Sequence, residues 1–310
     1  MRRISKICQR GYAGLIRPFA GKAAEPWPMS RGEDIEPVFV VGSGRCGSTL
    51  LRRLLIAGDE LQIGPELQGV GPMLEECRRS AGRSWKYLSA MAWHHLSLYN
   101  EWDDYELSRR EVLKRLRAIP TEMRSAAAML DAVHRLYGEK HGGAKRWGDK
   151  TPGHSGYMPM LHETFPRARY LHALRDGVDV VVSYLKTKLA RSPAHGAGIW
   201  MDRVSKVAEF QQAHPELVRE VRYEELVADP GAYMAGVCEF VGLRWDPAWA
   251  NRTDHVNDMG DVDRRDWHEA VRRPVNTSAV GRGREGLDPA MRRELAVMND
   301  TLVRFGYEPL

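Results

Sequence analysis

The stretch PVFVVGSGRCGSTLLRRLL, residues 37–55, predicts how the fold begins. Its first part, PVFVV (37–41), is a continuous β-branched and aromatic run, which is typical of a buried parallel strand. A glycine-rich turn follows. Residues 48–58 then have a helical period, with leucines on one face and Arg52 and Arg53 on the opposite face. A strand, a glycine-rich turn and a helix in this order form the opening of a βα unit.

Two further βα units are predicted downstream. RYLHAL (169–174) precedes a helical stretch at 179–190, and EVRYEEL (220–226) precedes another at 230–243. Repeated βα units favour a parallel sheet that is covered by helices. The predicted fold class is therefore α/β, with a P-loop-type central parallel sheet flanked by helices. Residues 73–140 predict a mainly helical insertion into this arrangement, which we expect on the side where an acceptor would bind.

The two ends of the chain differ in pattern. We predict that residues 1–36 are a flexible basic tail and a proline-containing linker, and that residues 37–310 form a single domain. The basic residues of 1–24 are Arg2, Arg3, Lys6, Arg10, Arg17 and Lys22. Such a start also leaves an organelle-targeting peptide or a membrane-surface segment open. At the other end, residues 289–310 predict one amphipathic helix that ends at Gly306.

The composition is that of an ordinary globular protein. Of 310 residues, 43% are hydrophobic and 28% are charged, which excludes a disordered chain, a collagen-like repeat and a coiled-coil rod. No apolar run is long enough to span a membrane. The net charge, 46 − 41 = +5, suits an anionic ligand, but no basic stripe alternates with aromatic residues, so we expect no nucleic-acid partner. The four cysteines form no disulfide framework and no CxxC pair, which favours a reducing, cytoplasmic location.

The turn in VGSGRCGSTLL (41–51) predicts a phosphate site. Backbone N–H groups of a glycine-rich turn that opens onto a helix bind anions. The residues that allow the turn or add donors are Gly42, Gly44, Gly47, Ser48 and Thr49. The ATP-type loop GxxxxGK[ST] has a lysine where this chain has Ser48, which argues against ATP or GTP. The cation of this loop is instead Arg45.

A second anion site is predicted at the end of the strand 169–174. Arg175 follows that strand directly, in the crevice where α/β sheets bind their ligands, and an arginine there suits a phosphate. Ser183 comes eight residues later, about two helical turns on, and can face the same ligand.

These two segments resemble those of sulfotransferases that use 3′-phosphoadenosine 5′-phosphosulfate (PAPS). GRCGSTLL resembles the 5′-phosphosulfate-binding loop of that family, in which a Lys or Arg precedes a small residue, a glycine and Ser/Thr residues. The matching positions here are Arg45, Cys46, Gly47, Ser48 and Thr49. LRDGVDVVVSYL (174–185) resembles the family's 3′-phosphate-binding segment, which maps onto Arg175 and Ser183.

The resemblance extends to the branch of protein-tyrosine sulfotransferases and related bacterial enzymes, and it runs from about residue 37 to 310. The further segments are GPELQGVGPML (64–74), GDKTPGH (148–154), VRYEELVADP (221–230) and RRPVNTSAVGRGR (272–284). They imply that Glu66 is the catalytic base, Lys150 a transition-state cation and Tyr223 a neighbour of the nucleotide. In the last segment Gly281 replaces the family's serine and is followed by Arg282.

The resemblance implies the reaction. PAPS would be the donor cosubstrate and adenosine 3′,5′-bisphosphate the product. Arg45 and Lys150 would neutralise the leaving phosphate, so we expect no metal ion. Glu66 would take the proton of an acceptor hydroxyl, with His154 as the second choice. The acceptor stays open among small phenols, tyrosyl peptides and glycans, including lipid-linked ones.

Two other functions stay open from the sequence. The first is a P-loop kinase or NTPase, although the chain lacks the lysine of that loop and gives Arg175 and Ser183 no role in it. The second is a non-catalytic protein that only binds the nucleotide. Animal protein-tyrosine sulfotransferases have a membrane anchor and luminal cysteine pairs, and this chain shows neither, a difference that bears on the acceptor more than on the donor. A homodimer is also left open.

Overall fold

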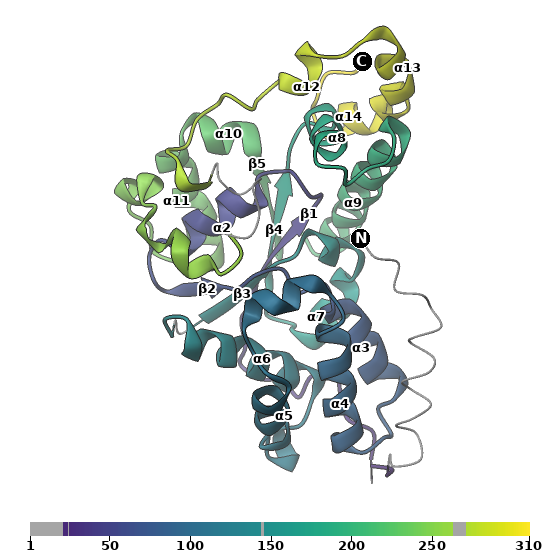
Figure 1. Cartoon of the computed structure of the whole chain (residues 1–310), viewed down its shortest axis with the longest axis vertical. Coiled ribbons are helices and arrows are strands. Elements are labelled where there is room, and N and C mark those ends of the chain that lie inside the picture. The colour runs from purple at the N-terminus through teal and green to yellow at the C-terminus, as the bar shows by residue number, and fades with distance from the viewer. Residues whose placement is uncertain (1–20, 24, 144–145, 263–270) are drawn as a thin grey trace.

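Five parallel strands form the centre of the protein in the order β2-β3-β1-β4-β5 (Figure 1). The structure is a computed structural model, and it describes residues 21–23, 25–143, 146–262 and 271–310. The strands are β1 (Val38–Gly42), β2 (Leu61–Ile63), β3 (Arg146–Lys150), β4 (Arg169–Leu174) and β5 (Val218–Arg222). This arrangement confirms the predicted α/β class with a central parallel sheet.

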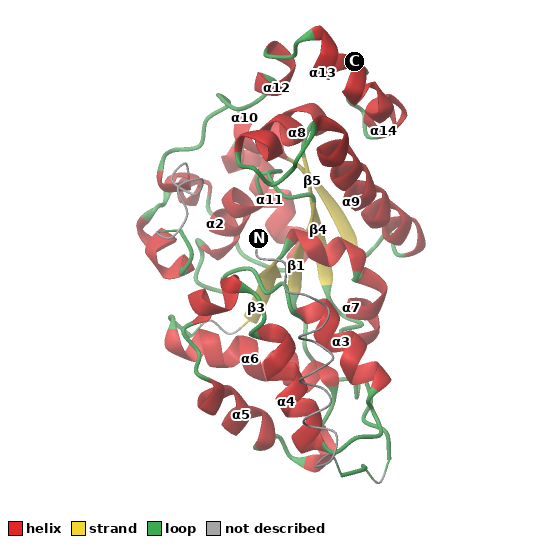
Figure 2. Cartoon of the chain, turned by 45° about the vertical axis from the view of Figure 1, so that its right-hand side comes forward, coloured by secondary structure: helices red, strands yellow, loops and turns green. Residues whose placement is uncertain are grey.

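Helices cover both faces of the sheet (Figure 2). Because successive side chains of a strand point to opposite faces, β1 divides its residues between two cores. Val38 and Val40 pack with α2 (Ser48–Ile56) and α11 (Pro230–Val241). Phe39 and Val41 pack on the other side, with α3 (Val70–Arg79), α4 (Trp85–Leu96), α6 (Ala126–Lys140), α7 (Met158–Thr164) and the later part of α9 (Pro193–Ala213).

The region predicted as a helical insertion contains most of α3 and then α4, α5 (Arg109–Arg117) and α6, with the short 3-10 helices η2 (Asn100–Tyr105) and η3 (Thr121–Met123). Serine side chains begin three of these helices, because a hydroxyl satisfies an otherwise unpaired N–H of the first turn. Ser84 caps α4, Ser125 caps α6, and Ser108 forms a reciprocal capping box with Glu111 in α5. These helices gather at the end of the molecule away from the C-terminus (Figure 1).

A third core lies between α8 (Gly177–Lys186), α9 and the C-terminal helices. The single helix predicted over 289–310 is wrong: α13 (Pro289–Leu295) and α14 (Asn299–Arg304) are separated by a 3-10 turn, η8 (Ala296–Met298). Leu295 and Met298 remain buried across this break. An i, i+3 spacing is common to α- and 3-10 helices, so the apolar pattern does not reveal the turn.

Residues 1–20 and residue 24, which belong to the predicted basic tail, lie outside the described residues. Part of the stretch predicted as a linker packs against the fold. The Trp27 indole donates to the Arg83 carbonyl at 2.9 Å, and Met29 is buried among the residues of the insertion. The start of the domain at residue 37 stays a prediction.

Arg52 and Arg53 are completely buried, although the sequence places them opposite the leucines of α2. Arg52 donates to the carbonyl of Ile63 at 2.9 Å and to the Asp261 carboxylate at 2.8 Å. Arg53 donates to backbone carbonyls, including that of Val271 at 2.8 Å. The expected polar face is covered because the chain after α11 folds back over α2 (Figure 1).

Candidate active site

Each strand of the sheet ends at one of the residues that the sequence predicts for the site. In sheet order these are Glu66 after β2, Lys150 at the end of β3, Arg45 after β1, Arg175 after β4 and Tyr223 after β5. All strands are parallel, so these residues lie along one edge. Neighbouring strands are ~4.8 Å apart, so the row spans about 19 Å. Ligands of open α/β sheets bind at this edge.

The loop between β1 and α2 has the geometry of an anion site. Arg45 has a positive φ of 65° and Gly47 one of 83°. At Gly47 the requirement for glycine is also steric, because a Cβ atom would lie 2.4 Å from the ring of Tyr223. Tyr223 therefore lies against the loop, whose backbone N–H groups lead into the first turn of α2.

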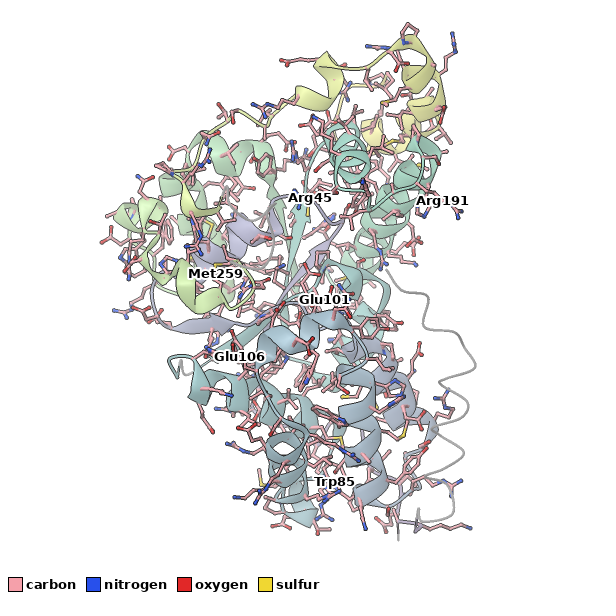
Figure 3. All side chains as sticks on the ribbon, in the orientation of Figure 1. Arg45, Trp85, Glu101, Glu106, Arg191 and Met259 are labelled. Atoms are coloured by element: carbon pink, nitrogen blue, oxygen red, sulfur yellow. The ribbon has the colours of Figure 1, made fainter. Side chains whose placement is uncertain are left out.

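Arg45 links this loop to α8. Its Nε donates to the Ser183 hydroxyl at 3.1 Å, and Arg175 donates to the Arg45 carbonyl at 3.4 Å. Figure 3 labels Arg45 at the carboxyl ends of the strands. Burial and the nearby charge of Arg175 lower the pKa of Arg45, and within the described residues it forms no ion pair. The two predicted phosphate sites are thus adjacent, and their excess positive charge favours an anion.

Arg175 lies over the ring of Tyr223, 4.6 Å from its centroid, a cation–π arrangement. It also forms an ion pair of 2.9 Å with Asp179. Burial raises the pKa of Tyr223, whereas the charge of Arg175 lowers it. Arg282 is exposed at the start of α12 (Arg282–Glu285), and its binding role stays a prediction.

Lys150 and Glu66 form an ion pair at the ends of β3 and β2. Lys150 Nζ lies 2.7 Å from Glu66 Oε1, and the exposed fractions of the two side chains are 0% and 20%. The Gln68 amide donates to the other Glu66 oxygen at 2.8 Å. The carboxylate is therefore held in place by two donors while part of it faces solvent, as a base that must meet an acceptor requires.

His154, the second choice as a base, lies on the other face of the sheet. Lys150 aligns with Val40, whereas Asp149 aligns with Phe39, so their side chains point in opposite directions. The His154 ring is buried and lies 3.2 Å from Asp149. Burial would raise the pKa of Asp149, but the charge and hydrogen bond of His154 lower it. His154 thus contacts Asp149 and Phe39, on the face of the sheet opposite to the Lys150 side chain.

The remaining residues of the predicted loop are mostly buried. Cys46 donates from its thiol to the Ser43 carbonyl at 2.5 Å, and burial raises the pKa of Cys46 to about 11. Ser48 is buried and Thr49 half-buried in the first turn of α2. Gly44 lies beside Tyr184, whose hydroxyl is 2.8 Å from that of Ser43.

Three contributing residues were missed by sequence reasoning. Gln68 orients Glu66, the Thr151 hydroxyl accepts from Leu67 N at 2.8 Å, and Asp179 pairs with Arg175. Gln68 and Thr151 lie within the quoted motifs 64–74 and 148–154, so their proximity to Glu66 and Lys150 was the available signal.

Two features are absent from the part of the chain that the structure describes. None of its helices has the length and apolar character needed to cross a bilayer. No three histidine, cysteine, aspartate or glutamate side chains there are grouped as metal ligands would be.

The parallel sheet, the glycine-rich loop between β1 and α2 and the cations at the strand ends define a P-loop-type α/β protein. A model of the sulfotransferase family matches residues 37–247, and the chain belongs to this family. This confirms the resemblance predicted from the sequence and the predicted class of enzyme.

Relatives and solved structures agree with this assignment. Protein-tyrosine sulfotransferase 1 of Danio rerio is 22% identical over 295 residues, which cover 91% of this chain and 75% of that protein. Protein-tyrosine sulfotransferase A of Caenorhabditis elegans is 24% identical over 283 residues, 88% of this chain and 67% of that protein. The sulfotransferase domain of the Synechococcus PCC 7002 olefin synthase has a TM-score of 0.63 at 19% identity and covers 90% of this chain and 98% of that domain, which shows the shared fold.

Proposed function

We propose that this enzyme transfers the sulfuryl group of PAPS to an acceptor hydroxyl and releases adenosine 3′,5′-bisphosphate. The observation that carries the proposal is the hydrogen bond between Arg45 and Ser183, because it joins the loop after β1 to the helix after β4. Two phosphate sites that meet in this way suit a nucleotide with phosphates at both its 5′ and 3′ positions.

The reaction follows from the order of charges along the strand ends. The acceptor oxygen forms a bond to sulfur while the bond from sulfur to the 5′-phosphate oxygen breaks, and negative charge grows on that phosphate. Arg45, Lys150 and the N–H groups of the loop would stabilise this charge, which their contacts with Ser183 and Glu66 at the strand ends support. The acceptor proton goes to the Glu66 carboxylate, which lies beside Lys150 and is partly open to solvent.

For the acceptor we propose only its broad class, a molecule with a hydroxyl group. The relatives in Danio rerio and Caenorhabditis elegans are named for protein tyrosine, and a tyrosyl peptide is therefore the first acceptor to test. Phenolic metabolites and carbohydrates have hydroxyl groups that the same base could deprotonate. We further propose a cytoplasmic enzyme, supported by three buried free cysteines among the described residues. A homodimer stays a prediction, which light scattering can test.

The test is mass spectrometry of peptide, phenol and glycan libraries incubated with the enzyme and PAPS. The expected result is an acceptor that gains one sulfuryl group while adenosine 3′,5′-bisphosphate accumulates. Stabilisation by ATP with Mg²⁺, but not by the bisphosphate, in a thermal-shift assay would instead favour a kinase or NTPase. Binding of the bisphosphate without any turnover would favour a non-catalytic nucleotide-binding protein.

A further inference from the structure

We propose that Asp179 is a positioning residue, which holds Arg175 and the loop 279–283 in place around the 3′-phosphate of the donor. This inference rests on the proposed function. Asp179 lies in the first turn of α8 and is 3% exposed. The residue was not among those that the sequence singled out.

The Asp179 carboxylate is the point where three segments meet. Its Oδ2 accepts from Arg175 Nη2 at 2.9 Å and from the Gly281 N–H at 2.9 Å. Its Oδ1 accepts from the Gly283 N–H at 2.6 Å. One buried charge thus receives hydrogen bonds from the arginine after β4 and from two amides about a hundred residues later in the chain.

The loop 279–283 is pressed closely against α8. A Cβ atom on Gly283 would lie 2.7 Å from Asp179 Cα, so the approach depends on glycine at this position. On the same loop, the carbonyl of Ala279 accepts a second hydrogen bond from Arg175 Nη2. Arg175 and the loop are therefore fixed to each other as well as to Asp179.

The clamp that Asp179, Arg175 and the loop 279–283 form leaves at least one N–H of Arg175 for a ligand. The Nε–H of Arg175 is buried and has no hydrogen-bond partner among the residues that the structure describes. The guanidinium cannot rotate to satisfy it without losing Asp179, the Ala279 carbonyl and the stacking on Tyr223. A phosphate oxygen is a suitable acceptor, because a charged hydrogen bond is stronger than a neutral one.

Two roles of Asp179, charge repulsion and positioning, predict opposite effects of its neutralisation on anion binding. An affinity measurement can therefore distinguish them. A carboxylate close to a phosphate site should weaken anion binding, and its neutralisation should then strengthen it. If Asp179 acts by positioning, its neutralisation should weaken binding, and only for ligands that have a 3′-phosphate.

The experiment measures the affinities of Asp179→Asn and wild type for adenosine 3′,5′-bisphosphate and for adenosine 5′-monophosphate, which lacks the 3′-phosphate. We expect at least tenfold weaker binding of the bisphosphate and a change below twofold for the monophosphate. Hydrogen exchange in 279–283 should become faster in the variant. The exposed Asp202→Asn, on α9, is the matched control and should change neither affinity.

Unchanged or tighter bisphosphate binding by Asp179→Asn would overturn the inference, as would equal weakening of both ligands. If that variant does not fold, Gly283→Ala tests the same clamp by displacing the loop, with the same expected selective loss. A wild-type protein that does not bind the bisphosphate would reject the proposed function itself. The exchange rates of 279–283 would still report on the clamp.

Discussion

Lys150 is a fully buried cation whose ion-pair partner among the described residues is the carboxylate of Glu66. The pair places the proposed base and one of the proposed transition-state cations within hydrogen-bond distance of each other. Catalysis would therefore depend on two side chains that also stabilise each other.

Substitution of Glu66 tests the base. Glu66→Gln keeps the shape and removes the basicity, so kcat should fall by about 10²- to 10⁴-fold, the usual contribution of a general base. The KM for PAPS should change little, because Glu66 is not assigned to the nucleotide. Steady-state kinetics gives both values. His154→Gln is the comparison, and a large loss of kcat there with near-normal Glu66→Gln activity would show that the base is misassigned.

Substitution of Arg175 tests the 3′-phosphate site. Hydrogen bonds to a charged group contribute ~1.5–3 kcal/mol, so Arg175→Ala should weaken PAPS binding by about 10- to 150-fold. Adenosine 5′-phosphosulfate, which lacks the 3′-phosphate, should be affected much less. Competition binding measures both. Equal losses of affinity for PAPS and adenosine 5′-phosphosulfate would show that Arg175 does not bind the 3′-phosphate.

Helix α2 connects the phosphate loop to the C-terminal part of the chain. Its N-terminus receives the loop, and its two buried arginines bind segments on either side of residues 263–270. The anion site and the packing of the segment after α11 thus depend on the same helix.

Removal of the Arg52 charge should destabilise the fold. Arg52→Met leaves the Asp261 carboxylate buried without this ion pair, and loss of one partner of a buried pair costs ~3–5 kcal/mol. Urea unfolding measures the loss. Adding Asp261→Asn to the same protein should recover part of it, because the second substitution removes the charge that Arg52 pairs with. This account would be contradicted if the double variant lost more unfolding free energy than the two single variants lose together.

The whole molecule contains buried neutral histidines that should make it sensitive to acid. Burial lowers the pKa of His134 to about 4 and that of His172 to about 3. The unfolded chain takes up these protons near its ordinary pKa of ~6.5, whereas the folded chain does not. The free energy of unfolding should therefore decrease as the pH falls below about 6.5, by up to ~1.4 kcal/mol per pH unit for each histidine.

His172→Phe should make the free energy of unfolding depend less steeply on pH between about pH 6 and 4. The number of protons taken up on unfolding should fall by up to one. Both ring nitrogens of His172 are buried without a hydrogen-bond partner among the described residues, so a phenyl ring of similar shape loses no bond there. Chemical denaturation over a pH series gives the slopes. A variant with the wild-type slope would show that His172 does not contribute.

Activity should also persist when metal ions are removed. Two cationic side chains, Lys150 at the end of β3 and Arg45 in the turn after β1, lie at the ends of neighbouring strands and can neutralise the leaving phosphate. We expect EDTA to leave the rate of bisphosphate release within about twofold of its value without chelator. A strict requirement for Mg²⁺ would favour phosphoryl transfer instead.

Features that depend only on neighbouring residues could be predicted from the local sequence. The run 37–41, the glycines after it and the leucines of the following helix specify a βα unit locally, and the structure has β1 and α2 there. Arg175 was predictable for the same reason, since it follows a recognisable strand. Parallel strands then bring such positions to one edge without further information.

Features that depend on contacts between segments far apart in the chain could not be predicted in this way. β3 has the polar sequence RWGDK and was not predicted as a strand, because its buried charges are acceptable only beside Glu66 and His154. Arg52 is buried because the chain near Asp261 folds over it. Asp179 joins Arg175 to Gly281 and Gly283, and a hydrogen bond across about a hundred residues leaves no periodic pattern in the sequence.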